Sequence, residues 1–218
     1  MAALTSFYPL IEPFVTGCPR PLVLQQLLAT LQDFFSFSRI WTEDIALGSV
    51  QPSSFPLVLT APVGTRILQV RSIHSVNPST GVDVTLYPKD RDWLRAWSPD
   101  YLTITGPDPY WFYTSGQGTF GLVPVPDDAL ELTPNVALTV ALDGSATDIP
   151  DELFYEYSDG IARGTVSRLM LMSEKSWSNP QLATAYAQTY VYARGAAKVT
   201  AQSDFNNAPL QVNLRRKF

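Results

Sequence analysis

Helical periodicity occurs only near the two ends of this chain, and that placement constrains its fold more than any other feature. Near the N-terminus, apolar side chains recur at the i, i+3, i+4 spacing of a helix face, and glutamines fall off that face. The apolar positions are Leu24, Leu27, Leu28, Leu31, Phe34 and Phe35, and the glutamines are Gln25, Gln26 and Gln32. With Pro19 and Pro21 in a first turn, the pattern predicts a helix over residues 21–37. A lone helix of this length is marginal in water, so we expect it to pack on helices from the other end of the chain.

Between these ends the sequence consists of short β-rich runs separated by proline and glycine. The runs are TRILQVRSIHSV, VDVTLYP, YLTITG, YWFYTS, TFGLVPVP and VALTVAL, and several alternate in apolarity. Many short strands with turn residues between them are typical of a β-sandwich or small barrel. We therefore expect an α+β fold, in which an antiparallel β-sandwich or barrel-like domain (residues 41–147) is inserted into a discontinuous helical domain (residues 1–40 and 148–218).

Three smaller segments have less regular patterns. Residues 1–18 are punctuated by proline and glycine, so we expect them to be irregular. The run DRDWLRAW is either a short helical turn or an irregular crossover, and SGQGTFG is typical of a hairpin turn.

Helical patterning returns near residue 148. Asp148 and Asp151, with Pro150 between them, predict a capped helix start. The run SEKSWSNP ends that helix, and a second begins at Asn179 or Pro180. Beyond it, NNAPLQVNLRRKF predicts an extended tail with a basic end.

Two glycines interrupt the first of these helices. Gly160 and Gly164 lie four residues apart, hence on one face, and each costs about 1 kcal/mol relative to alanine. Small residues recur at the same spacing in the second helix, at Ala193 and Ala197. Close packing of helices, within one subunit or between subunits, offsets this cost. The alternative is that each glycine is a tolerated local weakness.

Composition narrows the functional classes. The net charge is −5, which argues against an overall electrostatic grip on nucleic acid. Charged residues make up only 16% of the chain, so either part of the surface is covered by partners or the β region has a surface of Ser, Thr and Gln. Cys18 is the only cysteine, which excludes an intrachain disulfide. Neither a signal peptide nor a membrane-spanning run is recognisable.

Catalytic motifs are missing from the sequence. His74 is the only histidine, lies in a strand-like run, and has neither a Gly-x-Ser-x-Gly elbow nor nearby metal ligands. The acids of PDEL suit a helix N-terminus, which favours negative charge; paired carboxylates for glycoside chemistry are the alternative. We expect no enzyme activity, cofactor or metal, and a hydrolase built on scattered carboxylates is the rival interpretation.

Aromatic and basic clusters suggest binding. The run DPYWFYTS is densely aromatic, and Trp93 and Trp97 lie nearby in sequence. These aromatic side chains either belong to the hydrophobic core or form an exposed surface that binds sugars or a protein. Arg194 and Lys198 stand at i, i+4 on the last helix, ahead of a basic C-terminus. This basic end is either a solvated tail or a segment that docks on an acidic partner.

The two ends together resemble the head-to-tail adaptor (connector) proteins of short-tailed and related bacteriophages. The resemblance lies in DFFSFSRIWTEDI after the first helix, in TFGLVPVP, and in the order of motifs from residue 149 to the end of the last helix. The matching positions are Ser38, Trp41, Ile149, Pro150, Asp151, Leu153, Ile161, Ala162, Gly164, Lys175, Trp177, Asn179 and Pro180. Thr165 and Ser176 depart from the family pattern, and the β region matches loosely.

The resemblance implies a virion structural protein. Such a protein assembles in the host cytoplasm and forms a ring, commonly dodecameric, beneath the portal protein. The ring extends the channel through which genomic DNA passes, and it is the platform to which the tail or nozzle protein attaches. It also implies a contact with the portal or a neighbouring subunit through Arg194, Lys198, Leu214, Arg215, Arg216, Lys217 and Phe218, and helix packing through Gly160, Gly164, Trp177, Ala193 and Ala197. The alternative is a monomeric β-sandwich module on a helical scaffold that binds carbohydrate or protein through residues 110–113.

Overall fold

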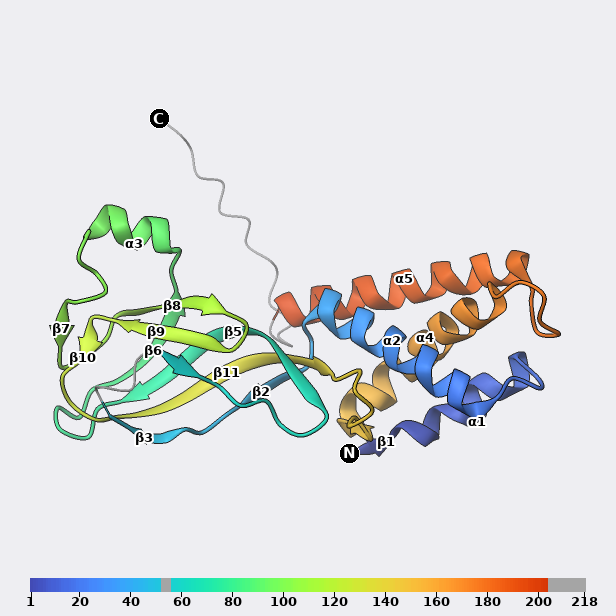
Figure 1. Ribbon diagram of the computed structural model, residues 1–218, viewed down its shortest axis with the longest axis horizontal. Helices are drawn as coiled ribbons and strands as arrows, with labels where there is room; N and C mark the ends of the chain where they lie inside the picture. Colours follow the sequence, from blue (N-terminus) through green and yellow to red (C-terminus); the bar gives the residue numbers. More distant parts are fainter. Residues whose placement is uncertain (52–55, 204–218) are drawn as a thin grey trace. The chain divides into compact units, whose positions relative to one another are not determined.

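The computed structural model describes residues 1–51 and 56–203, and its contacts divide the chain into two compact units (Figure 1). The helical unit consists of Met1–Ile40 and the described residues from Asp148 onward, and the β unit consists of Trp41–Thr147. The expected α+β class is confirmed, because the described residues form five α-helices, two of them long and C-terminal, and a curled mixed half-barrel sheet.

The helical unit is built on three long helices and a short N-terminal segment. The long helices are α2 (Arg20–Ser38), α4 (Asp151–Met170) and α5 (Pro180–Gln202). The smaller elements are β1 (Ala2–Ala3), η1 (Leu4–Phe7), α1 (Tyr8–Ile11), η2 (Glu12–Phe14) and β12 (Asp148–Ile149). Figure 1 shows α2, α4 and α5 packed side by side, and α4 contacts both of the others.

Local sequence explains the ends of the long helices. Helix α2 begins after Pro19 with a proline in its first turn, and ends where Arg39 adopts a left-handed conformation and its N–H bonds to the Phe35 carbonyl. Helix α5 begins as the sequence predicted, because the Asn179 side chain accepts a hydrogen bond from the Leu182 N–H and Pro180 occupies the first turn.

Two expectations for the helical unit are wrong in detail. Residues 1–18 are not irregular throughout: short 3₁₀ and α turns bury Leu4, Phe7 and Ile11, a helical spacing that the prolines obscured. Asp148 does not cap α4, because it lies in β12 and pairs with β1. The residue preceding the helix is Pro150, with no side-chain cap bond, while the Asp151 carboxylate contacts the N-terminal amine at 2.7 Å.

The β unit contains one main sheet. Its elements are β2 (Thr42–Asp44), β3 (Gly48–Val50), β4 (Leu57–Val58), β5 (Thr65–Val76), β6 (Asp83–Pro88), α3 (Arg91–Trp97), β7 (Thr105–Gly106), β8 (Trp111–Gly116), β9 (Thr119–Val123), β10 (Val125–Pro126) and β11 (Leu130–Val140). The main sheet runs β2-β11-β5-β6-β8-β9-β4, with β3 also pairing with β11. Pairing is mostly antiparallel, but β6–β8 and the separate β7–β10 pair are parallel, which differs from the wholly antiparallel expectation.

Irregular strand pairing curls the sheet, and helix α3 covers part of it. Strands β5 and β11 form a long antiparallel pair with register shifts between Asn135 and Val136 and between Ala137 and Leu138, and such irregularities bend a strand. The crossover from β6 to β8 contains α3, which confirms the helical reading of DRDWLRAW. The YLTITG run forms strand only at Thr105–Gly106, because Tyr101 instead joins a small core with Leu94, Tyr113 and Val123.

The predicted hairpin at SGQGTFG is confirmed. It joins β8 to β9, and Gly118 adopts a φ of +74° in its turn. Glycine permits this conformation without strain.

Candidate functional site

The two helix glycines lie where α4 meets its neighbours. A Cβ atom on Gly160 would lie 2.5 Å from the Cβ of Ala193 on α5. A Cβ on Gly164 would lie 2.5 Å from Cδ2 of Tyr190 on α5 and 2.9 Å from Cγ2 of Thr30 on α2. Both separations are too short for real side chains. The glycines therefore permit a three-helix contact that alanine would prevent, and this contact lies within one subunit.

A single carboxylate connects the same three helices. Asp33 on α2 accepts a 2.6 Å hydrogen bond from the Tyr190 hydroxyl and a 2.8 Å charge-assisted bond from Nη1 of Arg194. Nη2 of Arg168, on α4, lies 3.9 Å from the same oxygen. Burial raises the pKa of Tyr190, and the hydrogen bond to Asp33 adds to that shift. Hydrogen bonds to a charged group are the stronger kind, so this cluster fixes how the helices sit against each other.

The cations predicted to reach a partner are engaged inside the helical unit. The Arg194 guanidinium lies 4.2 Å from the centre of the Phe37 ring, and the Lys198 ammonium lies 4.6 Å from it. Nε of Arg194 is buried without a hydrogen-bond partner among the described residues. The structure thus gives Arg194 and Lys198 intramolecular contacts with α2. The other predicted contact residues, Leu214, Arg215, Arg216, Lys217 and Phe218, lie outside the described residues.

The remaining predicted packing residues have separate environments. Ala197 is buried in the helical unit, and Ala193 faces Gly160. Trp177 lies in the connection between α4 and α5 rather than in a helix, and is partly buried. Its indole Nε1 is buried and has no hydrogen-bond partner in the described part of the chain.

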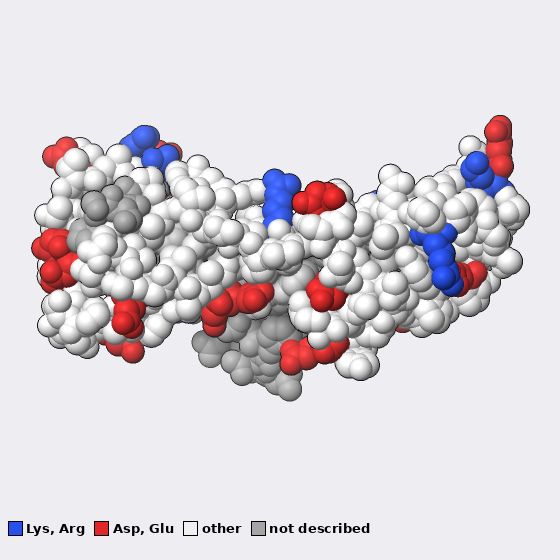
Figure 2. Space-filling view, turned by 60° about the horizontal axis from the view of Figure 1, so that its bottom comes forward, with Lys and Arg blue, Asp and Glu red and all other residues white. Residues whose placement is uncertain are grey.

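The outer face of α5 carries no charged side chain. Arg194 and Lys198 are the only charged residues of this helix, and both turn toward α2. Two large side chains of this helix are exposed: Tyr192 is 79% exposed and Val199 is 54% exposed. Figure 2 shows one face of the molecule on which most of the surface is likewise neither acidic nor basic. Exposed, uncharged helix faces of this kind are typical of surfaces that contact other proteins.

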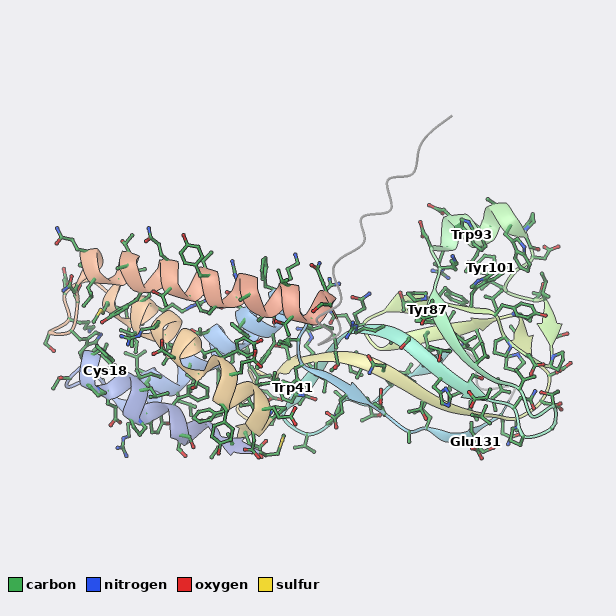
Figure 3. All side chains as sticks on the ribbon, turned by 180° about the vertical axis from the view of Figure 1, so that it is seen from behind. Cys18, Trp41, Tyr87, Trp93, Tyr101 and Glu131 are labelled. Carbon is green, nitrogen blue, oxygen red and sulfur yellow. The ribbon has the colours of Figure 1, made fainter. Side chains whose placement is uncertain are left out.

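The β unit presents an aromatic cluster around α3. The rings of Trp93 and Trp97 each pack edge-on against Trp111, with centroids 5.0 Å apart, yet remain 44% and 46% exposed. Tyr110 is next to Trp111, and the Lys89 ammonium lies 4.9 Å from the Trp93 ring centre. Figure 3 labels Trp93 on α3, with Tyr101 and Tyr87 nearby in the same unit. The aromatic residues are therefore divided between core (Phe112, Tyr113) and surface.

The described residues offer little for chemistry. His74 lies on β5 with its side chain about half exposed, and its Nδ1 is 3.4 Å from Asp83. Among residues 1–51 and 56–203, no group of three or more His, Cys, Asp or Glu side chains is placed to hold a metal ion. The helices within those residues include none long and apolar enough to cross a membrane.

Comparison with known families gives the decisive finding. The family model described as SU10 adaptor protein matches residues 21–213, which is most of the chain. The chain belongs to the SU10 adaptor protein family. No curated protein matches it in sequence. Because SU10 adaptors are phage head–tail adaptors, this chain is a structural, non-enzymatic virion component that binds other virion proteins.

Sequence reasoning missed the Asp33 cluster of this adaptor. The available indication was that Asp33 is the only charged residue between Arg20 and Arg39, within a helix that is otherwise apolar or uncharged. An isolated acid in such a helix is expected to have a partner. Its partners Tyr190 and Arg194 lie far away in sequence, and only the fold brings them together.

Proposed function

We propose that the protein forms a closed ring, dodecameric as in related connectors, beneath the portal of its phage. The ring extends the channel for genomic DNA and provides the platform on which the tail or nozzle protein assembles. The observation that carries this proposal is the family match over residues 21–213, combined with an exposed, uncharged outer face on α5. Rings use two different surfaces of each subunit, which close by rotation.

The net charge supports a channel through which DNA passes without being held. An acidic protein of net charge −5 repels the phosphate backbone on average. On α4, Asp151, Glu152, Glu156 and Asp159 are exposed. On this proposal, genomic DNA moves through the channel without being bound by the protein.

The C-terminal residues are the proposed contact with the portal. Arg194 and Lys198 already contact α2, so the free positive charge for an acidic surface is expected in Arg215, Arg216 and Lys217. Leu214 and Phe218 flank these cations and supply apolar area. The proposed contact therefore centres on the last residues of the chain.

Co-assembly with the purified portal of the same phage tests the proposal. The full-length protein is expected to form a ring on the portal in negative-stain electron microscopy, and deletion of residues 211–218 is expected to abolish binding while leaving the fold unchanged by circular dichroism. Mutating Arg39, which lies in the described part of the helical unit, to Gln serves as a charge-loss control. Failure of the full-length protein to bind the portal would contradict the function, whereas unchanged binding by the deletion variant would contradict only the role of the tail.

The exposed tryptophans support a second candidate, a binding module in the β unit. Half-exposed Trp93 and Trp97 offer ring area that suits a sugar or an apolar protein surface. Glycan-array binding that is lost in a double W93A/W97A variant would favour this function. Loss of tail attachment in the same variant, without glycan binding, would instead make this surface part of the adaptor platform.

A further inference from the structure

Positive charge is in excess where α2 and α5 meet. Arg194 lies 2.8 Å and Arg168 lies 3.9 Å from the same oxygen of Asp33. Lys198 has no carboxylate partner among the described residues, and its ammonium lies over the phenyl ring of Phe37 instead. Three cations therefore face one carboxylate, and contact with an aromatic ring does not neutralise an ammonium. We call these five residues the basic seam.

The basic seam is accessible to a partner. The side chains of Arg168 and Asp33 are more than a third exposed, and Phe37 is 40% exposed. Arg168 donates no hydrogen bond within the described residues, because its contact with Asp33 is too long for one. A phenyl ring flanked by cations with unused N–H donors suits the centre of a protein interface, and the partner it fits presents carboxylates.

The first half of α4 presents such carboxylates. An exposed stripe at spacings of three and four consists of Glu152, Tyr155, Glu156 and Asp159. We call it the acidic face. No cation pairs with Glu152 or Glu156 in the part of the chain that the structure describes, whereas Asp159 lies 3.3 Å from Nε of Arg163. Attraction to a helix N-terminus fades beyond the first turn, so it does not account for Glu156 and Asp159.

The basic seam and the acidic face occupy different sides of the helical unit. The bundle side of α4 is formed by its buried residues, among them Leu153, Tyr157 and Ile161, and the acidic face lies between them on the exposed side. Figure 1 shows α2 in front of α4, and Figure 3, seen from behind, shows α4 in front. One copy can therefore present the two surfaces to two different neighbours.

We propose that the basic seam of one copy binds the acidic face of the next copy around the ring. This inference rests on the proposed ring and adds which two surfaces meet. A closed ring needs two different complementary surfaces on every subunit. Contacts of seam with seam, or of acidic face with acidic face, would oppose charges of one sign, so the charges favour head-to-tail contacts over a two-fold dimer. Tyr155, which is 81% exposed, and Phe37 supply aromatic area to the two sides of the contact.

Charge reversal over each surface tests the contact. K198E reverses a charge of the basic seam without removing a hydrogen bond of Asp33, and E152K/E156K reverses the acidic face. We expect either variant to reduce the fraction of rings on the portal by tenfold or more, counted in electron micrographs and by mass photometry. The triple variant K198E/E152K/E156K restores opposite charges at every contact and is expected to recover assembly.

Matched controls separate this effect from a general change of charge or of stability. R95E and D128K/E131K make the same charge changes at exposed positions of the β unit, and both are expected to assemble like the unchanged protein. Urea unfolding identifies any variant that has lost its fold. Because assembly is electrostatic on this proposal, raising the salt concentration should lower the ring fraction of the unchanged protein.

Mixing experiments distinguish the rival contacts. If seam meets seam, equal amounts of K198E and unchanged protein recover assembly; if acidic face meets acidic face, E152K/E156K and unchanged protein do so. Either result overturns the proposal. If the seam binds the portal, E152K/E156K does not rescue K198E, which also overturns it. Normal rings from both reversed variants would refute the two surfaces but leave the adaptor function intact, whereas failure of the unchanged protein to form any ring would contradict the proposed function itself.

Carbodiimide cross-linking gives a readout that does not depend on inhibition. The reagent joins an amine to a carboxylate in direct contact, so it needs no assumption about which acid meets Lys198. Rings are assembled from equal amounts of ¹⁵N-labelled and unlabelled copies, and linked peptides are identified by mass spectrometry. We expect Lys198 joined to Glu152, Glu156 or Asp159 in peptide pairs of mixed label, which only two different copies can produce. Assembled rings without such mixed pairs would overturn the proposal.

Discussion

Replacing Gly164 with alanine tests whether the three-helix contact explains the glycine. In an ordinary helix this change gains about 1 kcal/mol of stability. Here the added methyl group would meet the Tyr190 ring at 2.5 Å and Thr30 at 2.9 Å. The ring cannot easily move, because its hydroxyl is bonded to Asp33. Overpacking typically costs about 1–3 kcal/mol, so after the gain in helix propensity we expect a net loss of about 0–2 kcal/mol in the free energy of unfolding.

Gly195 provides a matched control on the neighbouring helix. In the part of the chain that the structure describes, no heavy atom other than those of the chain neighbours and the helix's own backbone lies within 4 Å of the position that a Cβ on Gly195 would occupy. Gly195→Ala should therefore raise the free energy of unfolding by about 0.5–1 kcal/mol. Urea unfolding followed by circular dichroism at 222 nm measures both variants. Equal stabilisation by the two substitutions would show that Gly164 is not held by close packing, and would refute the explanation.

Three further predictions follow from the same helices. Gly160→Ala should destabilise the protein. Combining it with Ala193→Gly should lower the free energy of unfolding by less than the sum of the two single changes, because the two Cβ atoms would occupy the same space. Additive losses in urea unfolding would contradict this. Asp33→Asn should lower the free energy of unfolding by about 1–3 kcal/mol, since it weakens two bonds from α5, whereas Asp92→Asn on exposed α3 should change it little; equal effects would rule out the cluster's role. Burial, together with a hydrogen bond to a neighbouring glutamate, raises the pKa of Tyr157 to about 12. Its unfolded form ionises near its ordinary value of about 10, so stability present below pH 10 should decline as the pH rises to 12, and Tyr157→Phe should flatten that decline in urea titrations.

The sequence predicted most of the long elements because their evidence is local. The leucines and phenylalanines of α2 recur at helical spacing, and Asn179 with Pro180 marks the start of α5. The long β5 strand and the β8–β9 hairpin followed from β-rich runs and a glycine turn. In each case neighbouring residues alone determine the preference.

What the sequence did not predict depends on contacts between distant residues. Asp148 has the chemistry of a cap, but pairing of β12 with β1 at the N-terminus placed it in a strand instead. The parallel pairing of β6 with β8 follows from the crossover through α3. No local sequence pattern indicates this parallel pairing. Asp33 gained its role from Tyr190 and Arg194, which lie more than 150 positions away. The same contact ties Arg194 on α5 to α2, and a contact of Arg194 with the portal stays a prediction.

High-resolution electron cryo-microscopy of the head–tail junction in the mature phage tests the central claim most directly. The account predicts a closed ring of this chain between portal and tail, with the C-terminal residues on the portal. Finding the chain elsewhere in the virion, or as isolated copies that do not touch one another, would contradict it.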